Sequence, residues 1–325
     1  MQAESERASC QQPTRKGCAC TGTGRLETAA KTVLADTPDL QDPSYLKIRD
    51  VVYQISGIYH PAEKLYLLAS RCARRMTAIK AGTPAEYLDH LTVRGNREAE
   101  LRLLLNEITI GETYMFRSPQ QLEALRSVIL PQILQAKAAL GFKRLHLWSA
   151  GCSTGEEPYT LAMFLLELKE TLLCGWTFDI LATDLNDNSL AAARLGIYGE
   201  YALRSTSDLL RKKYFKPHDQ NRLQASEELK SLLRFDRVNL NDDSKMTFLK
   251  GMDLIFCCNV LIYFDLASKR KVMQHFYANL LPGGYLFLGH AESLYQVDDR
   301  FHLVHFPGAI GYWKPPVGCV AGVKR

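Results

Sequence analysis

The segment SAGCSTGEEPY, residues 149–159, places small residues and two glycines before a pair of glutamates, directly after the apolar run LHLW. Glycine lets a backbone approach a ligand closely, whereas the carboxylates of Glu156 and Glu157 would repel a phosphate. Gly151 and Gly155 are four residues apart, so the turn lacks the G-x-G-x-x-G spacing of NAD- and FAD-binding folds. The turn therefore favours a ligand with hydroxyl groups or a positive charge.

Three further polar side chains lie at the ends of apolar runs: Asp184 in ILATDLN, Asn239 in VNLND and Asn259 in CCNVLIYF. In open parallel sheets, ligands bind beyond the carboxyl ends of the strands. An aspartate there can accept both hydroxyls of a ribose, although taken alone it could equally cap the next helix. The asparagines alone could merely satisfy loop backbone. Together with the glycine turn, these positions indicate a nucleoside with a positively charged tail, such as S-adenosylmethionine (SAM).

In the segments that must position these residues, the spacing of apolar residues alternates between that of a strand and that of a helix. Short apolar runs typical of strands are RLHLWSA, FDILATD, LLRFDRVNL, MDLIFCCNV and GGYLFLGH, and several are separated by helical patterns such as 158–171 and 267–281. This alternation predicts an α/β fold with a doubly wound, mainly parallel sheet. Residues 199–232 interrupt it with a charged stretch too long for a simple loop, which indicates a small inserted subdomain.

The chain in front of the sheet has a different character. From Tyr45 onward apolar residues recur at helical spacing, with further helical stretches at 61–80, 84–92 and 97–109. We therefore expect a polar, disordered tail over 1–42, a small all-helical domain over 43–118 and the ligand-binding domain over 119–325.

Composition excludes several classes of protein. The 325 residues are 46% hydrophobic and 23% charged, which is typical of a globular protein. No apolar run approaches the ~20 residues that span a bilayer, and the first 30 residues lack the apolar core of a secretory signal. We expect a cytoplasmic protein that does not insert into the membrane. A net charge of +5 is too mild to indicate nucleic-acid binding, and the nine cysteines lack the paired spacing of a metal site.

A set of motifs occurs in a specific order along the chain: ITIGETYMFR (108–117), WSAGCSTGEEPYTLAM (148–163), ILATDLN (180–186), ARLGIY (193–198), RVNL (237–240), IFCCNVLIYF (255–264) and LFLGHAESL (286–294). From about Tyr45 to about Tyr312 the chain resembles the CheR-type chemotaxis receptor glutamate methyltransferases. The resemblance implies a class I SAM-dependent methyltransferase fold, Rossmann-like, preceded by a small all-α domain and carrying a small inserted β-subdomain.

The resemblance also implies a set of site residues. Tyr263 corresponds to a tyrosine close to the transferred methyl group, and Arg117 would steer a carboxylate of the substrate or of the cofactor; these two are the candidate catalytic residues. Two positions depart from the family pattern: Gly111 stands where Asn is frequent, and Cys258 stands where Arg is common. The candidate cofactor-binding residues are Gly111, Thr113, Arg117, Gly151, Glu157, Asp184, Asn239, Leu240, Cys258 and Asn259.

The implied reaction transfers a methyl group from SAM to glutamate side chains of a chemoreceptor, leaving S-adenosylhomocysteine (SAH). A glutamate with a pKa near ~4.3 is already a nucleophile at neutral pH, so alignment of the reactants is the main requirement. The expected partner is the cytoplasmic helical bundle of a membrane chemoreceptor. Arg71, Arg74 and Arg75 share one helical face that could dock it, or that could simply be solvated.

We expect the chain to act as a monomer. Two alternatives stay open: a SAM-dependent methyltransferase with another substrate, and a SAM-binding scaffold or sensor without catalysis. Gly111 and Cys258 are the features that favour the second alternative.

Overall fold

The computed structural model describes residues 40–93, 95, 97–109, 111–247 and 249–316. Most of the predicted tail therefore lies outside the described residues. No helix in these ranges is long and apolar enough to cross a membrane.

The first part of the described chain is helical. Its elements are α1 (Ser44–Ser56), the 3₁₀ turn η1 (Ala62–Lys64), α2 (Leu65–Ile79), α3 (Pro84–Thr92) and α4 (Arg97–Ile108). The helices share a core in which Ile48, Leu68 and Leu104 are fully buried. Helix α3 begins where the sequence supplies both signals for a start: the Thr83 side chain accepts the Glu86 N–H, and Pro84 occupies the first turn.

A second domain is built on a mixed sheet. Within the described ranges seven strands form it, in the order β6-β2-β1-β7-β8-β10-β9. The strands are β1 (Arg144–Ala150), β2 (Thr177–Asp184), β6 (Leu233–Arg237), β7 (Met252–Cys257), β8 (Leu280–Leu288), β9 (His302–Phe306) and β10 (Ala309–Trp313). β1, β2, β6, β7 and β8 run parallel, whereas β10 is antiparallel to both β8 and β9. This is the doubly wound, mainly parallel sheet that the sequence predicted.

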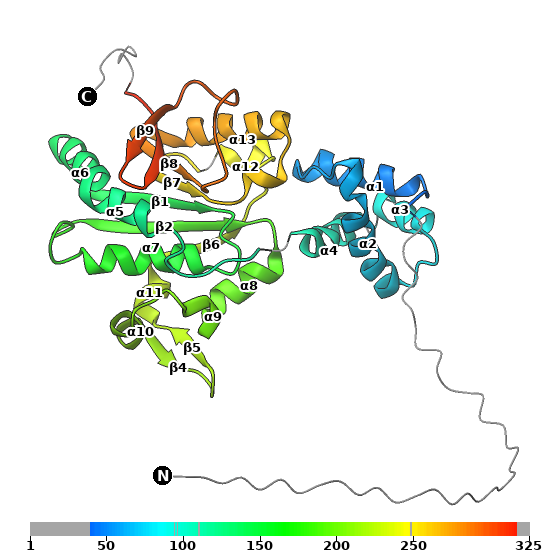
Figure 1. Cartoon of the computed structure of the whole chain (residues 1–325), viewed down its shortest axis with the longest axis horizontal. Helices are drawn as coiled ribbons and strands as arrows, with labels where there is room; N and C mark the ends of the chain where they lie inside the picture. Colours follow the sequence, from blue (N-terminus) through cyan, green and yellow to red (C-terminus); the bar gives the residue numbers. More distant parts are fainter. Residues whose placement is uncertain (1–39, 94, 96, 110, 248, 317–325) are drawn as a thin grey trace, which may run out of the picture. The chain divides into compact units, whose positions relative to one another are not determined.

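Helices cover both faces of this sheet (Figure 1). The helical elements of this domain outside the small sheet described below are α5 (Pro119–Ala124), the π-helical turn η2 (Leu125–Ile129), α6 (Leu130–Ala139), α7 (Glu156–Glu167), α8 (Asp187–Leu195), α12 (Asp243–Met246), the 3₁₀ turn η3 (Leu261–Tyr263) and α13 (Leu266–Asn279). One face packs Leu147 and Ile180 against α5–α6 and α7, and the other packs Trp148 and Ile255 against α13. Successive residues of a strand thus pack into two separate hydrophobic cores, one on each face of the sheet.

The helical segment before β1 changes its form near Pro131. α5 and α6 are joined by the π-helical turn at Leu125–Ile129, and Pro131 lies in the first turn of α6. Because proline has no N–H and clashes with the preceding turn, the wider helical turn before it accommodates the ring. The helix is therefore locally widened at this point.

A small antiparallel sheet is inserted between α8 and β6. It has the order β3-β5-β4, with β3 (Ile197–Gly199), β4 (Phe215–Pro217) and β5 (Arg222–Ala225). Short helices accompany it: α9 (Glu200–Leu203), α10 (Asp208–Tyr214) and α11 (Glu227–Ser231). Tyr198 and Phe215 belong to the same core as Leu147 of the main sheet, so the insertion is packed onto the larger domain.

A buried ion pair links helix α6 to strand β7 of the main sheet. Lys137 Nζ donates to both carboxylate oxygens of Asp253, at 2.8 and 2.6 Å, and the His146 N–H donates to Asp253 Oδ2 at 2.9 Å. The Asp253 side chain is only 3% exposed. Removing one partner would leave the other charge poorly solvated, which makes such pairs costly to break.

We predict that Asp253→Ala lowers the free energy of unfolding by about 3 kcal/mol, because Lys137 then keeps a half-buried charge without a partner. Asp179→Ala is the matched control, since the Asp179 side chain on β2 is 45% exposed and pairs with Arg144 at the surface; it should cost only about 0.5 kcal/mol. Urea denaturation measures both, and equal losses would contradict the prediction.

Candidate functional site

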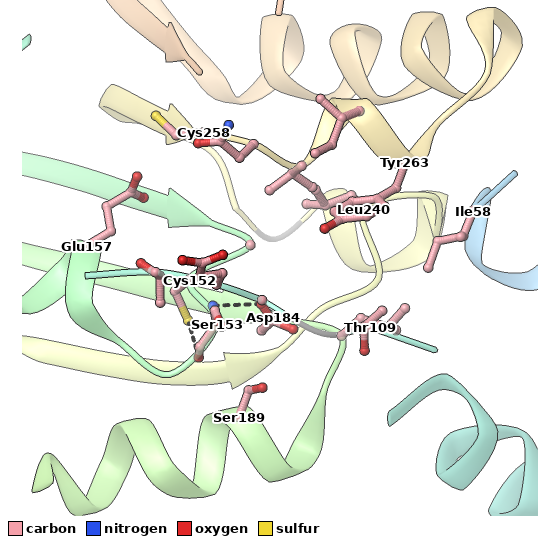
Figure 2. Close-up of a pocket in the computed structure, with 18 of the residues that line it drawn as sticks. Ile58, Thr109, Cys152, Ser153, Glu157, Asp184, Ser189, Leu240, Cys258 and Tyr263 are labelled. Atoms are coloured by element: carbon pink, nitrogen blue, oxygen red, sulfur yellow. Dashed lines mark hydrogen bonds between the residues drawn. The ribbon is translucent and has the colours of Figure 1, made fainter. Parts of the chain in front are cut away.

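A cavity of about 720 Å³ lies beyond the carboxyl ends of β1, β2 and β7, where the strand order reverses between β1 and β7. In Figure 2, Glu157, Asp184 and Tyr263 come from three separate segments around this space. The cavity is lined by all of the predicted cofactor positions and by Tyr263. These residues are Gly111, Thr113, Arg117, Gly151, Glu157, Asp184, Asn239, Leu240, Cys258, Asn259 and Tyr263.

The turn after β1 needs its glycines. Gly151 has φ +83°, and a Cβ placed there would lie 2.4 Å from Cγ2 of Val260. Gly155 has φ +98° and directly precedes α7, with its N–H donating to Cys152 O at 2.9 Å. L-residues with side chains rarely adopt these conformations, so the turn brings its backbone to the cavity only with glycine at both positions.

The two glutamates of the turn have different environments. Glu157 lines the cavity, and its Oε1 accepts a hydrogen bond from Ser149 Oγ at 2.6 Å. Burial raises the pKa of Glu157 and the nearby Glu292 charge raises it further, while Ser149, Cys258 and Arg117 lower it. The Glu156 carboxylate instead accepts from Thr154 Oγ1 at 2.7 Å. Glu157 is therefore the carboxylate that a cationic ligand in the cavity would neutralise.

Asp184, at the end of β2, lines the cavity and also accepts hydrogen bonds from backbone N–H groups. Its Oδ2 accepts the Ser153 N–H and its Oδ1 accepts the Asn186 N–H, each at 2.8 Å (Figure 2 draws the Ser153 bond). Burial raises the pKa of Asp184, and these backbone donors lower it. Asp184 does not cap α8, because the cap is Asn186, whose side chain accepts the Asn188 and Ser189 N–H groups. Each carboxylate oxygen of Asp184 keeps a second lone pair that a ligand hydroxyl could use.

The helical domain closes the cavity from the other side. Asn239 Nδ2 donates to Ile55 O of α1 at 2.6 Å, and the Tyr59 N–H donates to Tyr263 O at 2.9 Å. Asn186 Nδ2 donates to Thr109 O at 2.7 Å, next to the end of α4. Ser56, His60, Lys64 and Leu67 of this domain accordingly also line the cavity.

The segment 111–117 crosses between the two domains along the cavity. Arg117 donates to Glu112 O at 2.9 Å, and the Arg204 guanidinium lies over the rings of Tyr114 and Tyr201 at 3.4 and 3.8 Å. A Cβ at Gly111 would lie 2.3 Å from Ser153 Oγ. The glycine at 111 thus lets this segment lie directly against the turn after β1, where any side chain would have to displace Ser153.

The loop after β7 carries Cys258, Asn259 and Tyr263. Cys258 Sγ donates to Gln121 Oε1 at 3.7 Å, so the contact at this position is between neutral groups. Asn259 is in the left-handed region with φ +63°. Tyr263 is 47% exposed at the opening of the cavity.

Sequence reasoning missed Glu292 as a site residue, although the motif LFLGHAESL contains it. Its carboxylate accepts the backbone N–H groups of Asn259 at 2.8 Å and of Gly289 at 2.7 Å. An acidic residue in the turn after a predicted strand was the available signal, and the same signal identified Asp184.

The three arginines of α2 have different surroundings. Of these described residues, only Arg71 lines the cavity. Arg74 pairs with Glu107 at 3.2 Å, and Arg75 forms two bonds of 2.9 Å with the buried Glu100, which also accepts the Tyr87 hydroxyl. The shared helical face inferred from spacing is thus divided among three environments, and Arg75 belongs to the interior of the helical domain.

Comparisons with known proteins agree across nearly the whole described chain. Residues 43–109 match the family model for the CheR methyltransferase all-alpha domain, and residues 111–310 match that for its SAM-binding domain. Chemotaxis protein methyltransferase 2 of Vibrio cholerae is 33% identical over 86% of this chain and 95% of its own length. Chemotaxis protein methyltransferase of Borreliella burgdorferi is 34% identical over 75% and 86%.

A solved SAM-dependent methyltransferase from Methanosarcina mazei covers 53% of this chain and 74% of its own, with a TM-score of 0.28 and 16% identity, too low to support an argument. The two family models and the curated relatives together show that this chain belongs to the CheR methyltransferase family.

Proposed function

We propose that this protein transfers the methyl group of SAM to glutamate side chains on the cytoplasmic helical bundle of a chemoreceptor, as a monomer in the cytoplasm. The observation that carries the proposal is the single cavity lined by Glu157, Asp184, Arg117 and Tyr263 at the switch point of the sheet. Family membership, and relatives named chemotaxis protein methyltransferase, support the same reaction.

The residues present fit the cofactor. A cavity of about 720 Å³ is within the range of sites that enclose ligands of this size. Asp184 would hold the ribose hydroxyls, and Glu157 would hold the ammonium of the methionine tail. Arg117 is the cation available to a carboxylate of the cofactor or of the substrate. When bound, SAM supplies a methyl group activated by its sulfonium.

The chain's own contribution to the reaction is alignment. A glutamate is ionised at neutral pH and needs no general base. Tyr263 would orient the incoming carboxylate through its hydroxyl, while Asn259 and Cys258 shape the wall beside it. Closure by the helical domain keeps water away from the reacting groups, and alignment of this kind can contribute about 7–11 kcal/mol.

The opening of the cavity suits an acidic, amphipathic helix. Tyr59, Leu67, Ile262 and Tyr263 line it and are 42–51% exposed. Lys64 and Arg71 lie in the same lining. Exposed apolar side chains next to cations complement a helix that presents glutamates beside an apolar stripe. We propose that the receptor docks at this opening, with Arg71 as the contact from α2 that lies nearest the chemistry.

The test of the function is transfer of radiolabelled methyl from SAM to membranes that contain the organism's chemoreceptors, with receptor-free membranes as the control. We expect label on the receptors that mild base releases as methanol, because a carboxyl methyl ester hydrolyses readily. Base-stable label would indicate another acceptor group. Absence of label, together with intact SAH binding, would favour another substrate or a non-catalytic sensor.

We predict that Glu157→Gln weakens SAH binding by at least about tenfold, because the ammonium loses a charged acceptor while the shape of the side chain is kept. Glu156→Gln is the matched control, since that carboxylate bonds Thr154, and it should leave the dissociation constant within about twofold. Calorimetric titration measures both, and equal effects would contradict the assignment.

The same pair of variants tests a pH dependence. Because burial raises the pKa of Glu157, the free protein protonates this carboxylate at a higher pH than an ordinary glutamate. Only the ionised form attracts the ammonium, so wild-type affinity for SAH should be highest above the raised pKa and fall as the pH falls through it. Glu157→Gln should flatten the dependence between pH 8 and pH 5, with Asp184 contributing the remainder.

We predict that Arg71→Ala raises KM for receptor membranes about fivefold with little change in kcat, because it removes one partly buried cation from the proposed docking surface. Arg74→Ala is the control, since Arg74 pairs with Glu107 and does not line the cavity. The receptor methylation assay provides both constants, and a fall in kcat for Arg71→Ala would instead place this residue in the reaction step.

A further inference from the structure

Glu292 closes the turn that follows β8. Its N–H donates to Gly289 O at 3.0 Å, and its Oε2 accepts the Gly289 N–H at 2.7 Å. These two bonds would suffice for a glutamate that only stabilised its own turn.

The same carboxylate also bonds the loop after β7, which is distant in sequence. Oε2 accepts the Asn259 N–H at 2.8 Å, and Oε1 accepts the Ile262 N–H at 3.2 Å. The partners are 33 and 30 residues away along the chain. Both oxygens are therefore used, and three main-chain donors converge on one charge, which makes the hydrogen bonds stronger than those between neutral groups.

The two residues bonded across this gap lie in the loop that forms the cavity wall. Asn259 has φ +63°, a conformation that costs a non-glycine residue roughly 1 kcal/mol and persists only where surrounding contacts impose it. Ile262 lies within η3 (Leu261–Tyr263), so its N–H fixes the turn that carries Tyr263. The Tyr59 N–H holds the other side of this turn through Tyr263 O at 2.9 Å.

Close packing keeps the carboxylate in this place. A Cβ at Gly289 would lie 2.9 Å from the Asn259 nitrogen and 2.9 Å from Glu292 Oε2. The ends of β7 and β8 thus meet without intervening side chains. The charge of Glu292 raises the pKa of Glu157, which lines the cavity, although Glu292 itself does not line it.

We propose that Glu292 is a positioning residue for methyl transfer: by accepting the Gly289, Asn259 and Ile262 N–H groups, its carboxylate sets the loop 258–263 and so aligns Tyr263 with the reacting carboxylate. The inference rests on the proposed function for its catalytic consequence. It assigns Glu292 no direct contact with cofactor or substrate.

The experiment compares wild type with Glu292→Ala, Glu292→Gln and the control Asp298→Asn. Gln keeps the size of the side chain and one acceptor oxygen, which can still bond the Asn259 and Gly289 N–H groups. Asp298 lies six residues further along the same segment, and its carboxylate bonds only Arg300 among the described residues. Three quantities are measured: hydrogen exchange of the 258–263 backbone, the dissociation constant of SAH, and kcat for receptor methylation.

We expect Glu292→Ala to speed exchange at Asn259 and Ile262, and to lower kcat about thirtyfold while weakening SAH binding only about threefold. Glu292→Gln should recover kcat to within about fivefold of wild type, and Asp298→Asn should match wild type in all three measurements. If the alanine variant does not fold, the glutamine variant and the control are compared, and partial loss of protection and of kcat in Glu292→Gln alone is expected.

Unchanged exchange in 258–263, or losses in kcat and SAH affinity that are equal, would overturn the proposal. A loss of thermal stability with kcat preserved in the folded protein would also overturn it, since Glu292 would then be only structural. Hydrogen exchange can be measured without turnover, so it separates the two proposals. If wild type does not methylate receptors but the protection of 258–263 still depends on Glu292, then the proposed function fails while the role of Glu292 in setting the loop stands.

Discussion

The site depends on two carboxylates that are buried from solvent in the wall of the cavity. Burial raises the pKa of both Glu157 and Asp184, so the ionised forms are disfavoured relative to those of exposed carboxyls. Asp184 receives partial compensation from backbone N–H groups, and Glu157 receives it from the Ser149 hydroxyl, Cys258 and the Arg117 charge. A ligand that brings hydroxyls to one and a positive charge to the other supplies the compensation that the protein lacks. The cavity is thus complementary to a nucleoside with a cationic tail.

This arrangement requires both domains. The sheet supplies the strand ends, but part of the cavity lining comes from the helical domain, which is joined to the sheet domain by the bonds from Asn239 to Ile55 and from Tyr59 to Tyr263. The proposed docking surface lies at the opening where the two domains meet. A receptor helix bound there would contact Tyr263 on one side and Arg71 on the other, which places substrate recognition beside the proposed reaction centre.

The two departures from the family pattern have physical explanations of different kinds. At Gly111 the backbone lies so close to Ser153 that a side chain would force a rearrangement, so the glycine permits a closer packing of the segment 111–117. At Cys258 a neutral thiol contacts Gln121, and Glu157 and Glu292 lie nearby. The cavity therefore has more negative charge than one with arginine at this position.

Local signals in the sequence were sufficient for the fold class and for the polar residues at the strand ends that line the cavity. Strand runs ended in polar residues, and parallel strands bring such ends to one edge of a sheet, so Asp184, Asn239 and Asn259 could be placed together. The turn after β1 was recognisable from its two glycines, Gly151 and Gly155, which adopt a positive φ that residues with side chains rarely adopt. The motifs in their order were sufficient for the family.

Tertiary structure decided the contacts between segments distant in sequence. Helical spacing grouped Arg71, Arg74 and Arg75, but Glu100, from another helix, draws Arg75 into the interior. The strand-end position of Asn239 was predictable, whereas its bond to Ile55 depends on how two domains pack. Glu292 lies in a quoted motif, yet its link to Asn259 spans 33 residues. Local periodicity reports which face a residue occupies; only the folded chain determines which partner it meets there, because that depends on the packing of whole elements.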